Sequence, residues 1–323
     1  MLTRRTCLAA LCSIGSAFVA RGARADGYPV KPVRVIVPYS AGGATDTLAR
    51  LVGARIEQDV GQRLVIDNRG GGASLIGTQA IATATADGYT IGMIDSAFTI
   101  NPGLFGRLPY DTRKDFAPIS QIATAPLVLV VHANVAADSA QALVALARRN
   151  PESLTFALPG LGTPVHLAGE QMREVAGVRF VYVPYRGAGP AIADFIAGQV
   201  QVTFATVPSI LEHVRASRAR ALAIVGARSA LLPDVPSMDE VGLAGIDAAL
   251  MFGFVAPAAV PAPIIAKLAE VAARAVTADP LRARLLQLGY APVGSDAATF
   301  AARIDADIAK WTRIIEIGNI RPN

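Results

Sequence analysis

The chain has 323 residues, of which 52% are hydrophobic and 17% are charged, so it is long enough for two ordinary α/β domains and is not a disordered protein. The formal net charge is +5, but four of the 30 basic residues lie in the first 25 positions, and the remainder is 26 basic against 25 acidic residues. Binding to nucleic acid requires a dense basic patch, and we therefore predict no nucleic-acid partner.

The first 25 residues have the pattern of a secretory signal peptide. Arg4 and Arg5 form a charged start, residues 8–20 are apolar, and the segment ends in the small-x-small pattern of Ala23–Ala25. We predict cleavage after Ala25, by either the general or the twin-arginine export route. The alternative is a cytosolic protein with an apolar first helix. Both cysteines lie inside this segment, so we expect no disulfide in the mature protein.

The rest of the chain alternates between strand and helix patterns. Apolar, β-branched runs predict strands at residues 33–37, 64–66, 89–94, 126–132, 154–157, 179–183, 200–205, 221–225 and 252–255. Apolar residues three to four positions apart predict helices after residue 43 and at residues 74–84, 139–149, 165–175, 191–197 and 297–317. Residues 101–118 are rich in proline, glycine and charge, and we predict an irregular segment there.

This alternation predicts mainly parallel sheets with helices on both faces. We predict two lobes, one formed by residues 27–125 plus 230–323 and the other by residues 126–229. No second long apolar segment follows the leader, so we expect the mature chain to be soluble.

Four strand–turn–helix junctions carry glycine-rich turns, around Gly42, Gly71, Gly162 and Gly187. In open parallel sheets such turns lie at the carboxyl ends of strands, where ligands bind. The free N–H groups at the following helix N-termini attract anions. Each turn alone is better explained as a plain connection, but two turns from each lobe together predict a ligand cleft between the lobes.

Other kinds of site lack their sequence patterns. No turn matches GxGxxG or GxxxxGK[ST], and no G-x-S-x-G elbow is present. The three histidines are scattered and form no H-E-x-x-H motif. We therefore predict no cofactor, no metal and no catalytic activity.

Four side chains near the turns have two explanations each. His166 lies in the first turn of a predicted helix, where a hydrogen bond within the turn or to Glu170 is as plausible as a ligand contact. For Asp46 we favour capping of backbone N–H groups over ligand binding. For Arg69 and Arg186 we favour a structural salt bridge, although Arg186 is better placed to attract anions.

A set of motifs in a fixed order resembles a known family. The motifs are VPYSAGGATD at 37–46, DNRGGGA at 67–73, ADGYT at 86–90, LPYD at 108–111 with DFAPI at 115–119, GTPVHLAGE at 162–170, VPYRG at 183–187 and LPDVPS at 232–237. In this order they resemble the extracytoplasmic solute receptors of tripartite tricarboxylate transport systems, the Bug-type receptors. The resemblance covers nearly the whole mature chain.

The resemblance implies an α/β, two-lobe periplasmic binding protein fold, type II-like, that closes on a small carboxylate in the cleft. The family's ligands include di- and tricarboxylates, acidic amino acids and some aromatic acids, and we predict the di- or tricarboxylate class. It also implies a periplasmic location and the membrane permease subunits of a tripartite tricarboxylate transporter as partner. We expect a monomer. The residues predicted to bind the ligand are Tyr39, Ala41, Gly42, Gly43, Asp46, Gly71, Gly72, Ala73, Ser96, Gly162, Thr163, His166, Tyr185, Arg186, Gly187 and Thr206.

Two positions depart from the pattern of the family. Asp or Asn is frequent near Ala205 and Thr206, and its absence disfavours an amino-acid ligand, whose ammonium group needs an acceptor. Met251 stands where Trp is common, and its flexible side chain is expected to widen or reshape the pocket. Two alternative functions stay open: an orphan receptor that presents its ligand to a sensor protein, and a secreted enzyme on a two-lobe fold.

Overall fold

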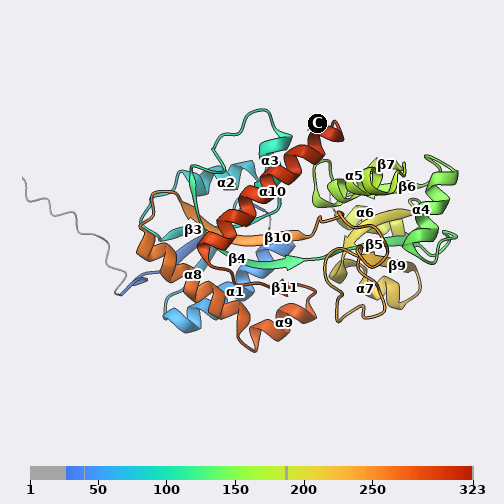
Figure 1. Ribbon diagram of the computed structural model, residues 1–323. Coiled ribbons are helices and arrows are strands. Elements are labelled where there is room, and N and C mark those ends of the chain that lie inside the picture. Colours follow the sequence, from blue (N-terminus) through green and yellow to red (C-terminus); the bar gives the residue numbers. More distant parts are fainter. Residues whose placement is uncertain (1–26, 40, 186–187, 322–323) are drawn as a thin grey trace, which may run out of the picture.

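The computed structural model describes residues 27–39, 41–185 and 188–321. The predicted signal peptide and two predicted site residues, Arg186 and Gly187, lie outside the described residues. The described chain forms two β-sheets that lie side by side, each covered by helices (Figure 1). None of the described helices is both long and apolar enough to span a bilayer.

The first sheet has six strands in the order β11-β4-β10-β3-β1-β2. Its strands are β1 (Val33–Val37), β2 (Leu64–Asn68), β3 (Thr90–Asp95), β4 (Phe116–Ala125), β10 (Leu250–Pro257) and β11 (Ala291–Pro292). The accompanying helices are α1 (Ala44–Val60), α2 (Leu75–Ala82), α3 (Ala97–Leu104), α8 (Ala262–Thr277), α9 (Leu281–Gln287) and α10 (Ala297–Ile317). We call these elements the first lobe.

The second sheet has five strands in the order β7-β6-β8-β5-β9. Its strands are β5 (Leu127–His132), β6 (Thr155–Leu158), β7 (Val181–Pro184), β8 (Val202–Thr206) and β9 (Ala219–Ile224). The accompanying helices are α4 (Ala140–Arg149), α5 (Pro164–Ala176), α6 (Ala188–Ile196) and α7 (Val207–Arg215). We call these elements the second lobe.

The prediction of mainly parallel sheets is wrong, because both sheets are mixed. β1 pairs with β2 and β3 in parallel, as does β6 with β7 and β8. β10 runs antiparallel to β3 and β4, and β5 runs antiparallel to β8 and β9. The strands next to the crossings between the lobes, β4, β5 and β10, are among the antiparallel ones. A parallel pair of consecutive strands requires a βαβ crossover, and these strands are not connected to their sheet neighbours in that way.

The prediction that residues 101–118 are irregular is also wrong in part. α3 continues to Leu104 with Pro102 inside it, and β4 begins at Phe116. Pro118 lies within β4 opposite Val255, next to a shift in the strand register. Proline is tolerated in strands at such irregularities, and its presence hid the strand pattern.

Helix α10 joins the cores of the two lobes. Phe300 and Ile304 belong to an apolar cluster of the first lobe. About two to three turns after Ile304, Trp311 and Ile315 belong to the cluster that contains Phe156 of the second sheet. The helix contacts α3 and α5, and Figure 1 shows it running from the first sheet toward α5. Its bounds are those predicted from the apolar spacing.

The chain returns to the first lobe later than residue 230, the boundary predicted from the sequence. Ser237 pairs with Ile224 at the end of β9, and Met238 and Ile246 belong to the apolar cluster of the second lobe. β10 then enters the first sheet at Leu250. We therefore propose 126–249 for the second lobe, with the return crossing at the start of β10.

Candidate ligand-binding site

Two adjoining cavities lie at the junction of the lobes, the first lined by both lobes and the second by the second lobe and Leu250 of β10. The larger, of about 210 Å³, is lined by Tyr39, Ala73, Asp95, Ser96, Ala97, Ile100, Asn101, Leu104, Leu161, Gly162, Thr163, Pro164 and Leu250. The second, of about 200 Å³, is lined by Leu127, Pro159, Thr163, Pro164, Val165, Ala188, Ala191, Ile192, Thr203, Phe204, Ala205, Thr206, Ser209 and Leu250. The two cavities share Thr163, Pro164 and Leu250, so we treat them as one interlobe cavity.

Six of the predicted binding residues line this interlobe cavity. They are Tyr39, Ala73, Ser96, Gly162, Thr163 and Thr206. The lining does not include Ala41, Gly42, Gly43, Asp46, Gly71, Gly72, His166 or Tyr185. The glycines of the first two turns are exposed and are not part of the lining, so their direct contact with a ligand stays a prediction.

Gly162 brings the two lobes into direct contact. Its backbone has a φ of +69°, a left-handed conformation that favours glycine. A Cβ atom at this position would lie 2.4 Å from Leu104 Cδ2 on α3 of the first lobe. Glycine therefore permits the turn before α5 to pack against α3 across the cavity.

His166 supports this turn rather than lining the cavity. The backbone N–H of Gly162 donates to His166 Nδ1 at 3.1 Å, and the hydroxyl of Thr163 accepts from the backbone N–H of His166 at 3.4 Å. The imidazole is 5% exposed, and Nε2 lies 4.0 Å from Glu170 Oε1. A neutral Nδ1 acceptor is required for the Gly162 bond, because a protonated imidazole has only donors.

Burial, together with the positive charge of Arg173, lowers the pKa of His166 from 6.5 to about 4. Because the unfolded chain takes up the proton first, this histidine's contribution to the stability is complete above pH 6.5 and is lost as the pH falls toward 4. We expect a loss of roughly 3 kcal/mol from this group over that interval. Urea unfolding of the wild type and of His166→Asn, which keeps an acceptor near Nδ1, measures it. Equal pH slopes in the two proteins would contradict this prediction.

Asp46 organises the first glycine turn from inside. Its carboxylate accepts from the N–H of Gly42 at 2.8 Å, from Arg50 at 3.0 Å and from Asn68 at 3.0 Å. Burial acts to raise the pKa of Asp46, but these hydrogen bonds outweigh it and hold the pKa below its usual value. With its oxygens occupied by the turn, Asp46 has a structural role, which favours the capping explanation.

The second glycine turn has an unusual backbone. Gly71 and Gly72 are followed by Ala73 and Ser74, both with positive φ, at 52° and 73°. Such conformations cost non-glycine residues about 1–2 kcal/mol each and persist where surrounding contacts hold them. Asn101 on α3 donates to the carbonyl of Ala73 at 3.0 Å. The turn is thereby fixed against α3 at the wall of the cavity.

Asp95 is a cavity residue that sequence reasoning missed. It ends β3, and its carboxylate accepts from the hydroxyl of Tyr39 at 2.5 Å, the N–H of Ala97 at 2.9 Å and the hydroxyl of Thr45 at 3.3 Å. Burial raises the pKa of Asp95, and these three hydrogen bonds act in the opposite direction. The signal that identifies it is its place at the carboxyl end of a central parallel strand, next to the predicted Ser96.

The expectation that Met251 shapes the pocket is not met. Met251 is fully buried in the apolar cluster with Phe300, and its N–H donates to Ser96 Oγ at 2.8 Å. Leu250, the preceding residue, lines the cavity instead. Alternate residues of a strand face opposite sides, which places Leu250 and Met251 on different faces of β10.

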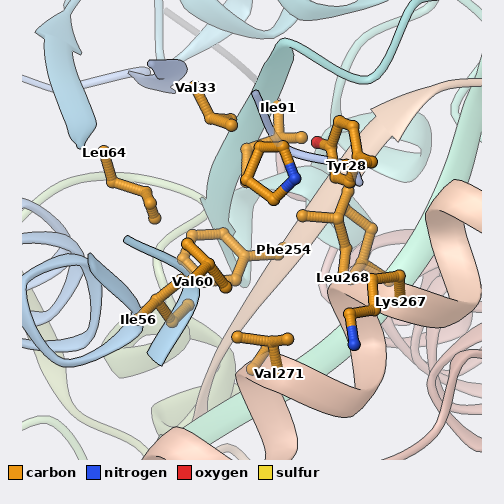
Figure 2. A pocket seen from close by; sticks show the side chains of 13 residues that line it. Tyr28, Val33, Ile56, Val60, Leu64, Ile91, Phe254, Lys267, Leu268 and Val271 are labelled. Atoms are coloured by element: carbon orange, nitrogen blue, oxygen red, sulfur yellow. The ribbon is translucent and has the colours of Figure 1, made fainter. Parts of the chain in front are cut away.

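A further cavity lies inside the first lobe, away from the interlobe cavity (Figure 2). Its lining is apolar except for the ends of Tyr28 and Lys267, and its volume is about 20 Å³. This volume is about a tenth of that of either interlobe cavity, so the space is a poor candidate for an organic ligand. It is a packing defect between α1, α8 and the sheet.

The fold and the cavity define a class of protein. Two α/β lobes joined by crossing strands, with a mostly apolar cavity that carries a few polar groups between them, fit the architecture of a solute-binding receptor. A sequence model of the family described as "Tripartite tricarboxylate transporter family receptor" matches residues 48–320, and the chain belongs to this family. Members of this family are periplasmic receptors that bind solutes.

Similar proteins agree with this assignment along nearly the full chain. "Protein BugT" of Bordetella pertussis is 33% identical over 94% of this chain and 94% of its own length. An R. palustris protein solved with adipate is 31% identical, with a TM-score of 0.81 over 92% of this chain and 100% of its own. MatC from Rhodopseudomonas palustris with bound malate is 27% identical, with a TM-score of 0.75 over 89% of this chain and 100% of its own. The predicted two-lobe fold is confirmed.

Proposed function

We propose that this protein captures a small carboxylate of the di- or tricarboxylate class between its two lobes and delivers it to a tripartite tricarboxylate transporter. The observation that carries the proposal is the interlobe cavity, whose described lining contains no Lys, Arg or His. Among the described residues, an anion there would be held by backbone, hydroxyl and amide groups. The adipate and malate bound by two similar proteins support the same ligand class.

Two helix N-termini lie at this cavity, and at that of α3 the N–H of Ala97 already donates to Asp95. Ser96 and Ala97 open α3 on the first lobe, and Thr163 and Pro164 open α5 on the second, and all four line the cavity. Carboxylates are stabilised at helix N-termini by the helix dipole and unpaired N–H groups. Each hydrogen bond to a carboxylate contributes roughly 1.5–3 kcal/mol. Four or five of them support an affinity near 1 μM, about 8 kcal/mol, after the cost of closure.

The cellular setting belongs to the same proposal. We propose a signal peptide cleaved after Ala25, a periplasmic monomer, and a membrane permease as partner. The second candidate function is delivery of the ligand to a sensor protein instead of a permease. A pair of genes for permease subunits next to the gene for this protein would argue against it. No enzymatic step is part of the proposal, and the family is one of solute receptors.

A thermal-shift screen of the protein without residues 1–25 tests the proposal. The protein is unfolded, freed of any bound ligand and refolded, then mixed with small carboxylates and with their amides. Binding to the folded state raises the melting temperature with occupancy. We expect a rise with at least one acid and none with its amide. A flat response to every acid, with a rise for neutral compounds, would overturn the carboxylate proposal.

A further inference from the structure

Asp95 introduces a negative group into a cavity proposed to hold an anion. Its side chain lines the interlobe cavity, and it is only partly exposed to solvent. In the described part of the chain no Lys, Arg or His forms a salt bridge with it, whereas Asp46, which is more deeply buried, pairs with Arg50. A carboxylate withdrawn from water without a cationic partner is costly.

The hydrogen bonds around Asp95 favour its ionised form. Tyr39, Ala97 and Thr45 all donate to its carboxylate, and these bonds oppose the rise in the pKa of Asp95 that burial causes. Tyr39 stays a donor, because burial and then the charge of Asp95 raise its pKa. An ionised carboxylate has about four acceptor positions, so Oδ2, with one 3.3 Å contact, keeps one unused.

The elements packed around Asp95 present few other titratable groups. The turn after β1 provides Tyr39, and Tyr110 lies near Tyr39. On α1, the charged pair of Asp46 and Arg50 is bonded to Asn68 and the first glycine turn. From the second lobe, the segment 161–164 that lines the same cavity contains no titratable side chain.

Resting on the proposed function, we propose that Asp95 determines specificity by accepting a hydrogen bond from a protonated amino group of the ligand. The ligand class is then a small carboxylate that also carries an ammonium group. Its carboxylate lies toward Thr163 at the N-terminus of α5, and its ammonium group lies toward Asp95 at the end of β3. Each lobe thus binds a group of one sign, and the ligand bridges them.

The missing Asp or Asn near Ala205 and Thr206 does not exclude an ammonium-bearing ligand if Asp95 is the acceptor. The acceptor that an ammonium group requires comes from the first lobe rather than the second. A second carboxylate beside ionised Asp95 would instead meet a like charge, which disfavours binding unless a proton is taken up. An amino dicarboxylate has an ammonium group for Asp95 and a carboxylate for the N-terminus of α5. It also belongs to the proposed dicarboxylate class.

Calorimetric titration of the refolded protein with matched acid pairs at pH 7.5 tests the assignment. The pairs differ in one amino group: succinate and aspartate, glutarate and glutamate, propionate and alanine, and 3-phenylpropionate and phenylalanine. We expect an amino member to bind roughly 10- to 100-fold more tightly than its partner, the range of one hydrogen bond to a charged group. Binding of both members with equal affinity would overturn the assignment and leave the carboxylate function standing. If no acid of any pair binds, the carboxylate function fails as well.

Two variants connect the preference to Asp95 itself. In Asp95→Asn the amide oxygen still accepts from Tyr39, and we expect the preference for the amino member to fall by at least tenfold. The exposed Asp234→Asn is the control, and it keeps the preference. Unchanged melting temperatures without ligand show that both variants fold.

The pH dependence separates this assignment from binding of a plain dianion. If a plain dianion binds with uptake of a proton by Asp95, its affinity for the wild type is higher at pH 5.5 than at pH 7.5. In Asp95→Asn, which cannot take up this proton, the two affinities are equal. That result would overturn the ammonium assignment. Tighter binding of the amino member at both pH values, lost in Asp95→Asn, supports it.

Discussion

Replacement of Trp311 by alanine is expected to lower the free energy of unfolding by about 3–5 kcal/mol, the usual cost of removing a large aromatic side chain from a core. Trp311 is the single tryptophan of the chain and is 1% exposed. It lies in the apolar cluster that contains Leu104 of α3 and Phe156 of the second sheet. The cavity left by alanine would therefore lie where α10 joins the two lobes.

Trp311→Phe is the matched control. The indole N–H is buried and has no hydrogen-bond partner in the described part of the chain, so phenylalanine removes an unsatisfied donor while keeping most of the apolar contact. We expect it to cost much less than alanine. Urea unfolding followed by circular dichroism measures both variants, since tryptophan fluorescence is lost. A cost below about 1 kcal/mol for alanine would contradict the role of α10 as the joining element.

Replacement of Gly162 by alanine is expected to weaken ligand binding at least tenfold, because the new methyl group would separate the turn before α5 from α3. The Cβ atom would lie 2.4 Å from Leu104 Cδ2, well inside contact distance, and the φ of +69° adds backbone strain. The turn and α3 both line the interlobe cavity, so a shift between them changes the geometry at both ends of the ligand. Titration with the acid found in the thermal-shift screen measures the effect.

Gly61→Ala separates strain from contact. Gly61 ends α1 with a φ of +70°, and a Cβ atom there would meet no atom within 4 Å. We expect Gly61→Ala to lower stability by a similar strain but to leave the affinity unchanged. The double variant Gly162→Ala with Leu104→Ala makes room for the methyl group, and we expect it to recover part of the affinity. Equal losses of affinity in Gly61→Ala and Gly162→Ala would contradict the contact across the cavity.

The sequence predicted the elements that have a regular apolar period. The three-to-four spacing of Phe300, Ile304, Ile308 and Trp311 fixed α10, since a long amphipathic helix has one buried face. It failed where proline interrupted the pattern, at α3 and at β4, because Pro102 and Pro118 are held by tertiary packing that local propensity does not contain.

The candidate site could be predicted as a location but only partly as a set of side chains. Strand ends and helix N-termini follow from local pattern, which placed Ser96 and Thr163 at the cavity. Which turn residues face the other lobe depends on how the lobes pack. The partner of Asp95, Tyr39, is 56 positions away in the chain, so this pair has no local signal. The exposure of Gly42 also has no local signal in the sequence. It follows from the hydrogen bond by which Asp46 on α1 holds the first glycine turn.

Hydrogen–deuterium exchange with and without the acid found in the screen tests most directly the claim that the ligand is held between the two lobes. We expect slower exchange at two separated segments together, the start of α3 around Ser96 in the first lobe and the turn around Gly162 in the second. Protection confined to one lobe, or located at the apolar cavity of Figure 2, would contradict it.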